Sequence, residues 1–563
     1  PRPAAGLKAG LVWDPLSHSH REPALMIGVA ASPADLEMAR EFFELFKTAW
    51  EPAVASRSYD VVLSTDGRIA DLDARVFLLY GSDEQVTDRQ SGMTVTRVDG
   101  AIGLAWDQSE LPLYGGAAQF DRTTTDPLLT LDGHAADYRS CTGSRAVWRI
   151  GYDLFREVRH LLTNGQPVSH AAVPTLEFHI AVLRHVLQQS AVSFVEIPPR
   201  PYGFDFTCCL THDIDFLGLT RHKFDRTLAG FLYRASCGTL VDLARGRKSA
   251  VEAARNWAAA LSVPFVFTGV LPDPWRPFDS YREVEQGRRS TFFLVPFKHR
   301  PGVSPDGDVQ PQRGVPYEVS EIHAELSGLA RSGSELAVHG IDAWRDADAG
   351  RAEIEQLTSV TGHQSPGVRM HWLYYGADSP RQLEAAGFAY DSTWGYNDAI
   401  GYRAGTSQSF KLPGTQGLME LPLSIMDSAL FYPSRMGLER RDAMQRCLPL
   451  IANARRFGGT LVINWHDRSL APERLWGRSY GELLEAIDAT GGAWFATAGE
   501  AVSWFQWRRS VRFIGSSPTG VTVTAPAPAM VPAAAIQVHR SADGRDASPD
   551  VHRFEGGSTR VHL

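Results

Sequence analysis

The stretch from Phe206 to Asp215, FTCCLTHDID, is the feature that most constrains how this chain can fold. Its first residues are β-branched, aromatic and small apolar side chains without alternation, which predicts a strand covered on both faces. Asp213 and Asp215 end the run, and carboxylates are costly to desolvate unless a cation or hydrogen-bond donors meet them. The pair therefore marks either an exposed strand end with solvated acids or a polar site at the edge of a sheet.

Strands and helices are predicted to alternate from about residue 205 to residue 508. Segments with apolar residues at helical spacing precede the strand-like runs ELAVHG, GVRMHW and TLVINWH. This order predicts parallel strands, arranged in a doubly wound sheet or a (β/α) barrel. In both architectures the chemistry gathers at the carboxyl ends of the strands.

Four of the predicted strands end with a histidine or an aspartate, in the segments TCCLTHDID, ELAVHG, GVRMHW and LVINWH. Core positions seldom hold an unpaired histidine or aspartate. Four such strand ends at one sheet edge are hard to explain by packing, so they predict a functional site.

The length of 563 residues predicts two to four domains, at roughly 100 to 200 residues per domain. Residues 1–197 are expected to form an N-terminal α/β domain of unknown role, which contains the helix GYDLFREVRHLL before an Asn-Gly stop. Residues 198–510 hold the alternating pattern, with a helical insertion at about 217–285. Residues 511–563 are expected to be a Pro/Ala-rich linker and a small C-terminal extension.

Charge and cysteine content narrow the class of protein. The formal net charge of −8 leaves no basic surplus for nucleic acid. Five cysteines without a CxxC pair resemble buried thiols more than a disulfide framework, which favours a reducing compartment. The longest apolar stretch falls short of the roughly 20 residues that span a bilayer. No apolar signal core is visible, so a cytoplasmic location is expected, although the sequence lacks an initiator Met and its start can be incomplete.

With the strand ends placed in order, residues 205–508 resemble the polysaccharide deacetylases of carbohydrate esterase family 4, which share the NodB-homology fold. The segments THDID, VHGIDAW, GVRMHWL, YDSTWGY and LVINWH are similar to the five motifs of that family, in the same order. The resemblance implies a distorted (β/α) barrel. It also implies metal-dependent hydrolysis of an N-acetyl group on a sugar of a polysaccharide or glycoconjugate.

Carried over one position at a time, the resemblance implies a role for each of seven residues. Asp213 resembles the general base, Asp215 the metal carboxylate, His339 a metal histidine, Arg369 the residue that orients the base, His466 the general acid, Asp391 the carboxylate that supports His466, and Trp394 a wall of the acetyl groove. A surface salt bridge is the alternative for Arg369.

The chain departs from the family pattern in the second motif, where the position four residues after His339 is Ala343 instead of a second histidine. An extra histidine, His371, stands at the end of another predicted strand. We therefore expect Asp215, His339 and His371 to bind a divalent metal, most simply zinc, which takes two imidazoles and one carboxylate and keeps an open position. The alternative for His371 is a hydrogen-bonded core residue.

Tryptophans flank the motifs at Trp372, Trp394 and Trp465, and aromatic faces beside a polar site suit sugar rings. Each of the three can equally be a core side chain. The segments 401–410 and 418–427 are expected either to line the substrate cleft or to be loop and strand.

Two other functions remain open on the sequence. The segment VHGIDAWRD also resembles the second motif of deformylases that act on lipid-linked aminosugars. A catalytically degenerate module that only binds glycans is the third possibility, and Ala343 is its best support.

Overall fold

The structure is a computed structural model that describes residues 24–562 apart from 122–125, 143–144, 276, 363–365, 472, 475, 518 and 541–547. The chain forms two compact units. Unit 1 comprises residues 1–165, 175–198 and 507–563, and unit 2 comprises residues 166–174 and 199–506. The middle of the sequence is thus an insertion into the unit that holds both outer parts.

Unit 1 contains two six-stranded sheets. The first has the order β11-β12-β4-β3-β1-β2, from β1 (Ala24–Ala30), β2 (Trp50–Pro52), β3 (Ser58–Ser64), β4 (Asp73–Tyr80), β11 (Asp137–Thr142) and β12 (Arg145–Ile150). The second has the order β5-β8-β10-β9-β6-β7, from β5 (Val95–Val98), β6 (Ile102–Trp106), β7 (Ser109–Leu113), β8 (Ala117–Phe120), β9 (Thr130–Leu131) and β10 (His134–Ala135). Its helices are α1 (Pro33–Leu45), α2 (Val86–Gln90), α3 (Leu154–Thr163) and α4 (Thr175–Gln189).

The last part of the chain adds strands to unit 1. One three-stranded sheet has the order β13-β26-β27, from β13 (Phe194–Glu196), β26 (Ala534–His539) and β27 (Asp550–Phe554), and another the order β24-β25-β28, from β24 (Arg512–Ser517), β25 (Gly520–Ala525) and β28 (Gly557–His562). The buried Arg508 guanidinium donates to the carbonyls of Glu44, Leu45 and Ile197, at distances of 2.6 to 3.0 Å. One side chain therefore ties the C-terminal part of unit 1 to two earlier segments.

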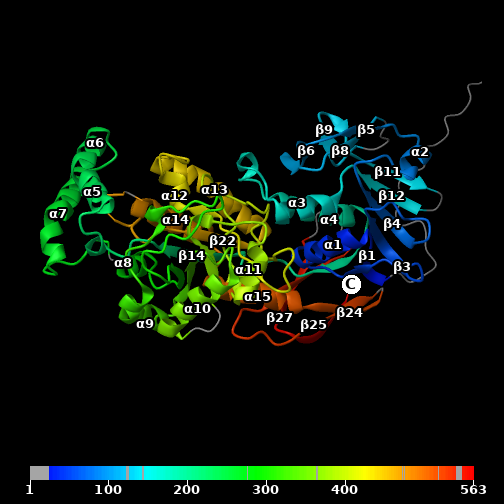
Figure 1. Ribbon diagram of the computed structural model, residues 1–563. Helices are drawn as coiled ribbons and strands as arrows, with labels where there is room; N and C mark the ends of the chain where they lie inside the picture. Colours follow the sequence, from blue (N-terminus) through cyan, green and yellow to red (C-terminus); the bar gives the residue numbers. More distant parts are fainter. Residues whose placement is uncertain are drawn as a thin grey trace, which may run out of the picture. The chain divides into compact units, whose positions relative to one another are not determined.

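Unit 2 is built on a ten-stranded, curled sheet, and Figure 1 labels two of its strands, β14 and β22. Its order is β19-β20-β18-β17-β16-β15-β14-β22-β21, with β23 also paired to β14; the strands are β14 (Phe206–Ile214), β15 (Ser290–Leu294), β16 (Glu335–Gly340), β17 (Val368–Met370), β18 (Tyr390–Asp391), β19 (Phe410–Lys411), β20 (Met419–Glu420), β21 (Ile425–Met426), β22 (Thr460–Asn464) and β23 (Ala493–Phe495). All pairs are parallel except β19 with β20. The predicted parallel α/β arrangement is confirmed as a half-barrel whose two outer strands are not paired with each other.

The predicted strand at FTCCLTHDI is confirmed, and it lies in the middle of this sheet. Every residue of β14 is buried, as the run without alternation predicted. Cys208 and Cys209 are buried thiols in it. Parallel pairing with β15 on one side and β22 on the other fixes the register of β14, and with it the position of Asp213 and Asp215 relative to the ends of the neighbouring strands.

Helices alternate with the strands of unit 2, as predicted. Besides the insertion described next, they are α9 (His323–Arg331), α10 (Ala347–Thr361), α11 (Ser379–Ala386), α12 (Asp427–Phe431), α13 (Arg440–Phe457), α14 (Trp476–Thr490) and α15 (Ala498–Ser510), in which the boundary between the two units falls. The helix stop before TLVINWH is Gly458 with φ +81°, a backbone conformation that glycine adopts without strain.

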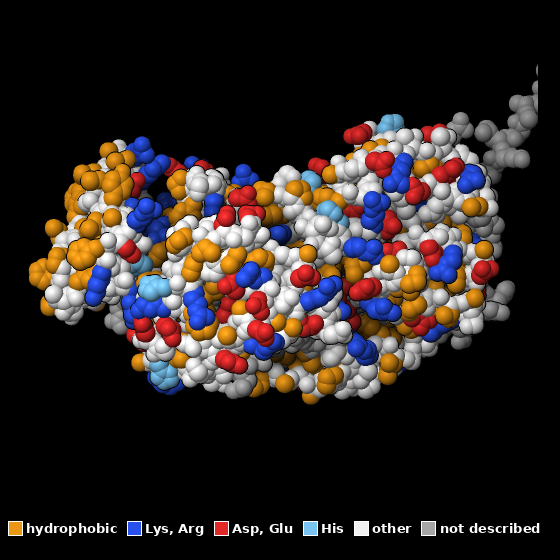
Figure 2. All heavy atoms as spheres, viewed as in Figure 1, with side chains coloured by type: hydrophobic (Ala, Val, Ile, Leu, Met, Phe, Trp, Pro, Cys, Tyr) orange, Lys and Arg blue, Asp and Glu red, His pale blue; other side chains and the backbone are white. Residues whose placement is uncertain are grey.

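Between β14 and β15 the chain forms helices rather than strands, namely α5 (Arg226–Tyr233), α6 (Thr239–Ala244), α7 (Ala250–Phe267) and α8 (Pro277–Val284). A π-helical turn at Arg234–Gly238 joins α5 to α6. Figure 2 shows hydrophobic side chains gathered over α5, α6 and α7, at the left of the view. In the described residues, no helix is both long and apolar enough to cross a membrane.

A fully buried histidine makes the stability of unit 1 sensitive to acid. His179 lies in α4, and its Nδ1 is 3.1 Å from the Tyr152 hydroxyl, while its Nε2 has no hydrogen-bond partner within the described residues. Burial lowers the pKa of His179 from 6.5 to about 3. The neutral ring is therefore kept in the folded chain at pH values where the unfolded chain binds a proton.

We expect the contribution of His179 to be fully present above about pH 6.5 and to be lost as the pH falls toward 3, because only the unfolded state then gains the proton. At about pH 5 the loss is roughly 2 kcal/mol. The free energy of unfolding, measured against pH, should fall less steeply in His179→Gln than in the wild type. His134→Gln, at an exposed histidine of the same unit, is the matched control and should follow the wild type; equal slopes in all three would contradict the assignment.

Candidate active site

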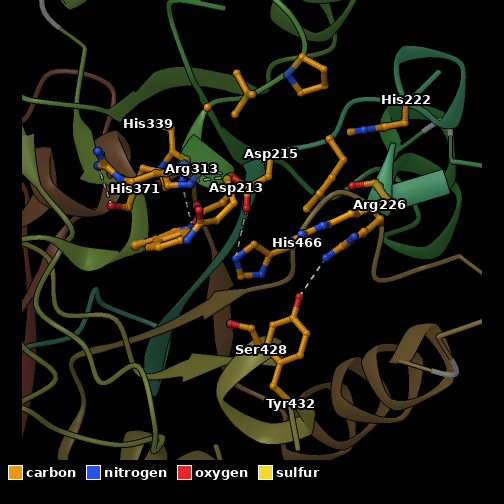
Figure 3. Close-up of a pocket in the computed structure, with 18 of the residues that line it drawn as sticks. Asp213, Asp215, His222, Arg226, Arg313, His339, His371, Ser428, Tyr432 and His466 are labelled. Carbon is orange, nitrogen blue, oxygen red and sulfur yellow. Dashed lines mark hydrogen bonds and ion pairs between the residues drawn. The ribbon is translucent and has the colours of Figure 1, made fainter. Parts of the chain in front are cut away.

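The predicted strand ends of unit 2 meet at one edge of the curled sheet (Figure 3). Because β14, β16, β17 and β22 run parallel, their carboxyl ends lie at the same edge. They bring together six of the side chains predicted from the motifs: Asp213, Asp215, His339, Arg369, His371 and His466. A cavity of about 570 Å³ opens at this edge.

Three of these side chains form a cluster with the composition of a metal site. The ligand atoms offered by Asp215, His339 and His371 all lie within 4.8 Å of one another. His339 Nε2 is 3.5 Å and His371 Nδ1 is 3.4 Å from Asp215 Oδ1, and the two imidazole centroids are 4.7 Å apart. The set of one carboxylate and two imidazoles suits a divalent transition metal.

The hydrogen-bond pattern of the cluster fits a cation. Asp215 Oδ1 and His371 Nδ1 are buried and have no hydrogen-bond partner among the residues that the structure describes, and buried polar atoms of native proteins are rarely left in this state. His339 Nδ1 lies 2.9 Å from the carbonyl of Arg369, which fixes the ring and leaves Nε2 facing the cluster. All three donor atoms are thus directed at a shared space.

The ionisation states also suit a ligand set. Burial lowers the pKa of His371 to about 3, so its imidazole is neutral, the form that binds metal. Burial works against ionised Asp215, but the neighbouring imidazoles of His371, His339 and His466 more than offset it and hold the pKa of Asp215 well below its usual range.

His371 reaches the cluster because the backbone turns sharply after β17. Trp372 and Leu373 have φ angles of +64° and +56°, which are uncommon for residues with a side chain and cost free energy. The buried Arg313 guanidinium holds this turn by donating to the carbonyls of Ile341 and His371, both at 2.9 Å. Arg313 comes from the loop before α9, outside the five motifs.

The position of the missing histidine is closed by packing. Ala343 is fully buried, and the space beside it is taken by α10, where Gly350 approaches so closely that a Cβ on Gly350 would lie 3.2 Å from that of Ala343. The preceding loop is held by Glu353, which accepts the amides of Ile341 and Asp342. A histidine at position 343 therefore has no room in this arrangement.

Asp213 lies beside the cluster and is held by two donors. Arg369 Nη1 donates to Oδ1 at 3.0 Å, and Asn464 Nδ2 donates to Oδ2 at 2.8 Å. Burial opposes ionisation, but His339 and Arg369 outweigh it and lower the pKa of Asp213. Arg369 is fully buried and also bonds Thr211 and Ser392, so the alternative of a surface salt bridge is wrong.

His466 faces Asp215 from the end of β22. Its Nε2 is 4.0 Å from Asp215 Oδ2, and its Nδ1 is 2.6 Å from Asp427 Oδ1. Asp427 Oδ2 also accepts the backbone amide of His466 at 2.8 Å. Burial opposes the charged ring, but Asp427 first, and then Asp215 and Asp213, raise the pKa of His466 to about 10.

The prediction that Asp391 supports His466 is wrong, because Asp427 takes that place. Asp391 lies on β18, four strands from β14 along the sheet and away from β22. It accepts the amide of Thr393 at 3.0 Å and adjoins Glu420. Burial raises the pKa of Asp391 to about 6, and burial together with the negative charge of Asp391 raises the pKa of Glu420 well above its usual range.

Of the three predicted groove tryptophans, Trp372 lines the cavity, whereas Trp394 and Trp465 are not among its described lining residues. Trp394 is buried against Tyr375 and Phe410, and Trp465 is buried and stacked on Tyr480. These two side chains belong to the core, the alternative that the sequence left open.

Arginines line the wall of the cavity near His466. Arg226, Arg435 and Arg468 contribute to it, and among the described residues none of the three has a carboxylate within ion-pair distance. Arg468 donates to the Tyr432 hydroxyl at 3.1 Å; burial works against the phenolate, but Arg468 outweighs it and lowers the pKa of Tyr432. The cavity therefore has an acidic centre and a basic wall.

The sequence reasoning missed Asn464, Asp427 and Arg313. Asn464 lies inside the quoted segment LVINWH, and Asp427 ends the segment 418–427 directly after β21. Both follow the pattern of a polar residue at a strand end, which could have found them. Arg313 sits in a loop without such a pattern.

No protein-family model and no curated protein match this chain. Solved structures that match include a Mycobacterium smegmatis protein described as a polysaccharide deacetylase, with 19% identity, a TM-score of 0.32, and coverage of 55% of this chain and 94% of that one. The carbohydrate deacetylase Agd3 matches with 9% identity and a TM-score of 0.37, over 97% of this chain and 99% of its own. The PuuE allantoinase matches with 13% identity and a TM-score of 0.35, over 54% and 91%. With identities and TM-scores this low, we draw the function from the site itself.

We expect the wild type to bind about one divalent ion per chain and His371→Ala to bind it at least about tenfold more weakly, since a third ligand is lost. Metal content after dialysis, and zinc titration against a competing chelator, measure this directly.

The matched control is His299→Ala, because His299 is an exposed histidine that lines the same cavity outside the cluster. It should bind metal as the wild type does. Full affinity in His371→Ala would show that the cluster of Asp215, His339 and His371 is not the metal site.

Proposed function

We propose that unit 2 is the catalytic unit of a metal-dependent hydrolase that removes an N-acetyl group from a sugar of a polysaccharide or glycoconjugate. One observation carries the proposal. Three potential metal ligands lie together, with an ionised carboxylate on one side of them and a protonated imidazole on the other. Asp213 and His466 both lie within 4.0 Å of a member of the cluster. Hydrolysis of an amide needs these two opposite proton-transfer groups around one reacting carbonyl.

Asp215, His339 and His371 would hold the metal. A divalent ion in such a site lowers the pKa of a bound water and polarises a carbonyl oxygen. We propose zinc, because neutral imidazole and carboxylate ligands in this number are common in catalytic zinc sites.

Asp213 is suited to accept the proton of the attacking water. Arg369 and Asn464 hold one oxygen each, so the carboxylate cannot rotate away. His339 and Arg369 lower its pKa and keep it ionised in a buried position, where a bare carboxylate would otherwise take up a proton.

His466 is suited to donate a proton to the leaving amine. Its Nδ1 is engaged by Asp427, which leaves Nε2 directed at the cluster. Because the negative charge of Asp427 raises its pKa, the ring is protonated at neutral pH. The pair resembles other buried carboxylate-imidazole pairs, in which the carboxylate orients the ring and stabilises its charge.

The sugar is inferred from the five strand-end segments, which resemble those of polysaccharide deacetylases, and from Trp372, whose ring lies at the cavity. The resemblance also supports a distorted, open (β/α) barrel for residues 198–510. Retention of Asp213, His466 and Arg369 in bonded positions argues against a module that only binds glycans.

We expect Asp213→Asn and His466→Ala each to lower kcat for acetate release from N-acetylated amino-sugar oligomers by roughly 10² to 10⁴-fold, with metal content unchanged. Asp427→Asn should lower kcat by a smaller factor, because it leaves His466 in place but removes its orienting charge. Acetate release and metal content are measured on the same samples.

Asp225→Asn is the matched control, since Asp225 lines the same cavity and its side chain caps α5, a role that asparagine fills equally well. It should retain the wild-type kcat. Release of formate from an N-formylated analogue, without release of acetate from the N-acetylated oligomer, would replace the proposal with deformylation. Glycan binding that a chelator does not alter, without release of any acid, would reduce the unit to a binding module.

A further inference from the structure

The helical insertion of unit 2 presents an unusually apolar outer surface. Phe224 is 99% exposed, Leu261 77% and Val270 71%. Further exposed apolar side chains surround them on the same helices and the loop that follows, namely Leu232, Tyr233, Leu240, Val241, Leu243, Val251, Trp257, Phe265 and Leu271. We call this set the apolar face; Figure 2 shows it as the hydrophobic surface over α5, α6 and α7. Soluble proteins rarely expose so many large apolar side chains together unless they bind something there.

The helix α7 shows that this exposure is patterned. Its exposed Val251, Ala254, Ala258, Leu261 and Phe265 recur at intervals of three and four residues, which places them along one side of the helix. The exposed side of α7 is therefore a continuous apolar stripe.

The opposite side of the insertion is already packed. Leu228 and Phe231 of α5 are buried with Trp275 and Ala471, and Ala260 and Val263 of α7 pack against that cluster. Trp275 Nε1 donates to Glu473 at 3.2 Å. The inner side of the insertion thus packs against the rest of unit 2. The apolar face is the outer, solvent-exposed side of the same insertion and is separate from its core.

The insertion that carries the apolar face is rich in cations. Residues 217–275 contain eight Lys and Arg residues against four Asp and Glu residues, a formal charge of +4 in a chain whose formal net charge is −8. Lys223, Arg226, Arg245 and Arg255 are exposed, and none of the four has a carboxylate within ion-pair distance in the described part of the chain. Large apolar side chains interspersed with unpaired cations are typical of surfaces that bind anionic membranes.

The same segment forms part of the mouth of the catalytic cavity. His222, Asp225, Arg226 and Thr227, at the start of α5, line the cavity next to His466 and Arg468. Phe224 lies between them in the sequence and points outward with its whole side chain exposed. A partner bound to the apolar face would therefore lie beside the mouth of the cavity.

We propose that the apolar face docks unit 2 on the surface of an anionic lipid bilayer. The side chains of Phe224, Leu261 and Phe265 insert at the level of the headgroups, and the four exposed cations contact lipid phosphates. A second copy of the chain is a poorer occupant, because two identical faces would bring their positive charges together. This inference goes beyond the proposed deacetylation and does not depend on it.

Sedimentation of the 563-residue chain with vesicles tests the proposal. Vesicles of phosphatidylcholine containing about one third phosphatidylglycerol should carry down the wild type, and pure phosphatidylcholine vesicles should carry down much less. Raising the salt from about 0.05 to about 0.5 M should weaken binding, since it screens the cations. The double variant with Leu261→Glu and Phe265→Glu should bind at least about tenfold more weakly, and Arg245→Glu with Arg255→Glu should lose the preference for phosphatidylglycerol.

The matched control is Leu448→Glu, which places the same charge at an exposed leucine of α13, in the same unit but outside the insertion. It should sediment with vesicles as the wild type does. Binding that is equal in the wild type and the Leu261→Glu, Phe265→Glu variant would overturn the proposal, as would a wild type that stays in the supernatant. A dimer in sedimentation equilibrium that the same double variant dissociates would assign the face to a second copy instead.

Discussion

The parallel pairing of β14 with β22 is the interaction on which the candidate site depends. It joins residues about 250 positions apart and puts Asp213 and Asp215, at the end of one strand, beside Asn464 and His466, at the end of the other. Both strands are wholly buried, so the register is fixed by packing on both faces. A shift by one residue would turn Asp213 away from Arg369 and Asn464, and the Asp213 carboxylate and the His466 imidazole would no longer face the same space.

Charge neutralisation is the second constraint. Burying Asp213 and Asp215 together is unfavourable unless positive or donating groups surround them. Arg369 and Asn464 donate hydrogen bonds to Asp213, whereas in the described part of the chain Asp215 has only histidines within ion-pair distance. Among the described residues, the buried Asp215 Oδ1 also has no hydrogen-bond donor. Asp215 is therefore the less well compensated of the two carboxylates.

Much of the candidate site could be predicted from the sequence, because most of its residues lie in segments with a local signal. The wrong assignment of Asp391 arose where such a local signal was missing. The unbroken apolar run of β14 and the strand-end histidines are local signals, and so is Ala343, whose place in the second motif led to the prediction that His371 joins Asp215 and His339. Asp391 and Asp427 could not be told apart in this way, since Asp391 ends one two-residue strand and Asp427 directly follows another, and neither strand shows periodicity. Which of them meets His466 is decided by the order of strands: β21 adjoins β22, whereas β18 lies on the far side of β14. Strand order is a property of the whole sheet.

The hydrogen bonds of Arg508 constrain the order in which the two units can complete folding during synthesis. Unit 1 draws on residues at both ends of the sequence, and Arg508 bonds the carbonyls of Glu44 and Ile197 only after unit 2 has been synthesised in full. At about 5 to 20 residues per second, the first strands wait roughly half a minute to a minute and a half for that partner. The unit that begins second in the chain is thus the first that can finish folding on the ribosome. During that interval the early strands of unit 1 are exposed to chaperones and to aggregation.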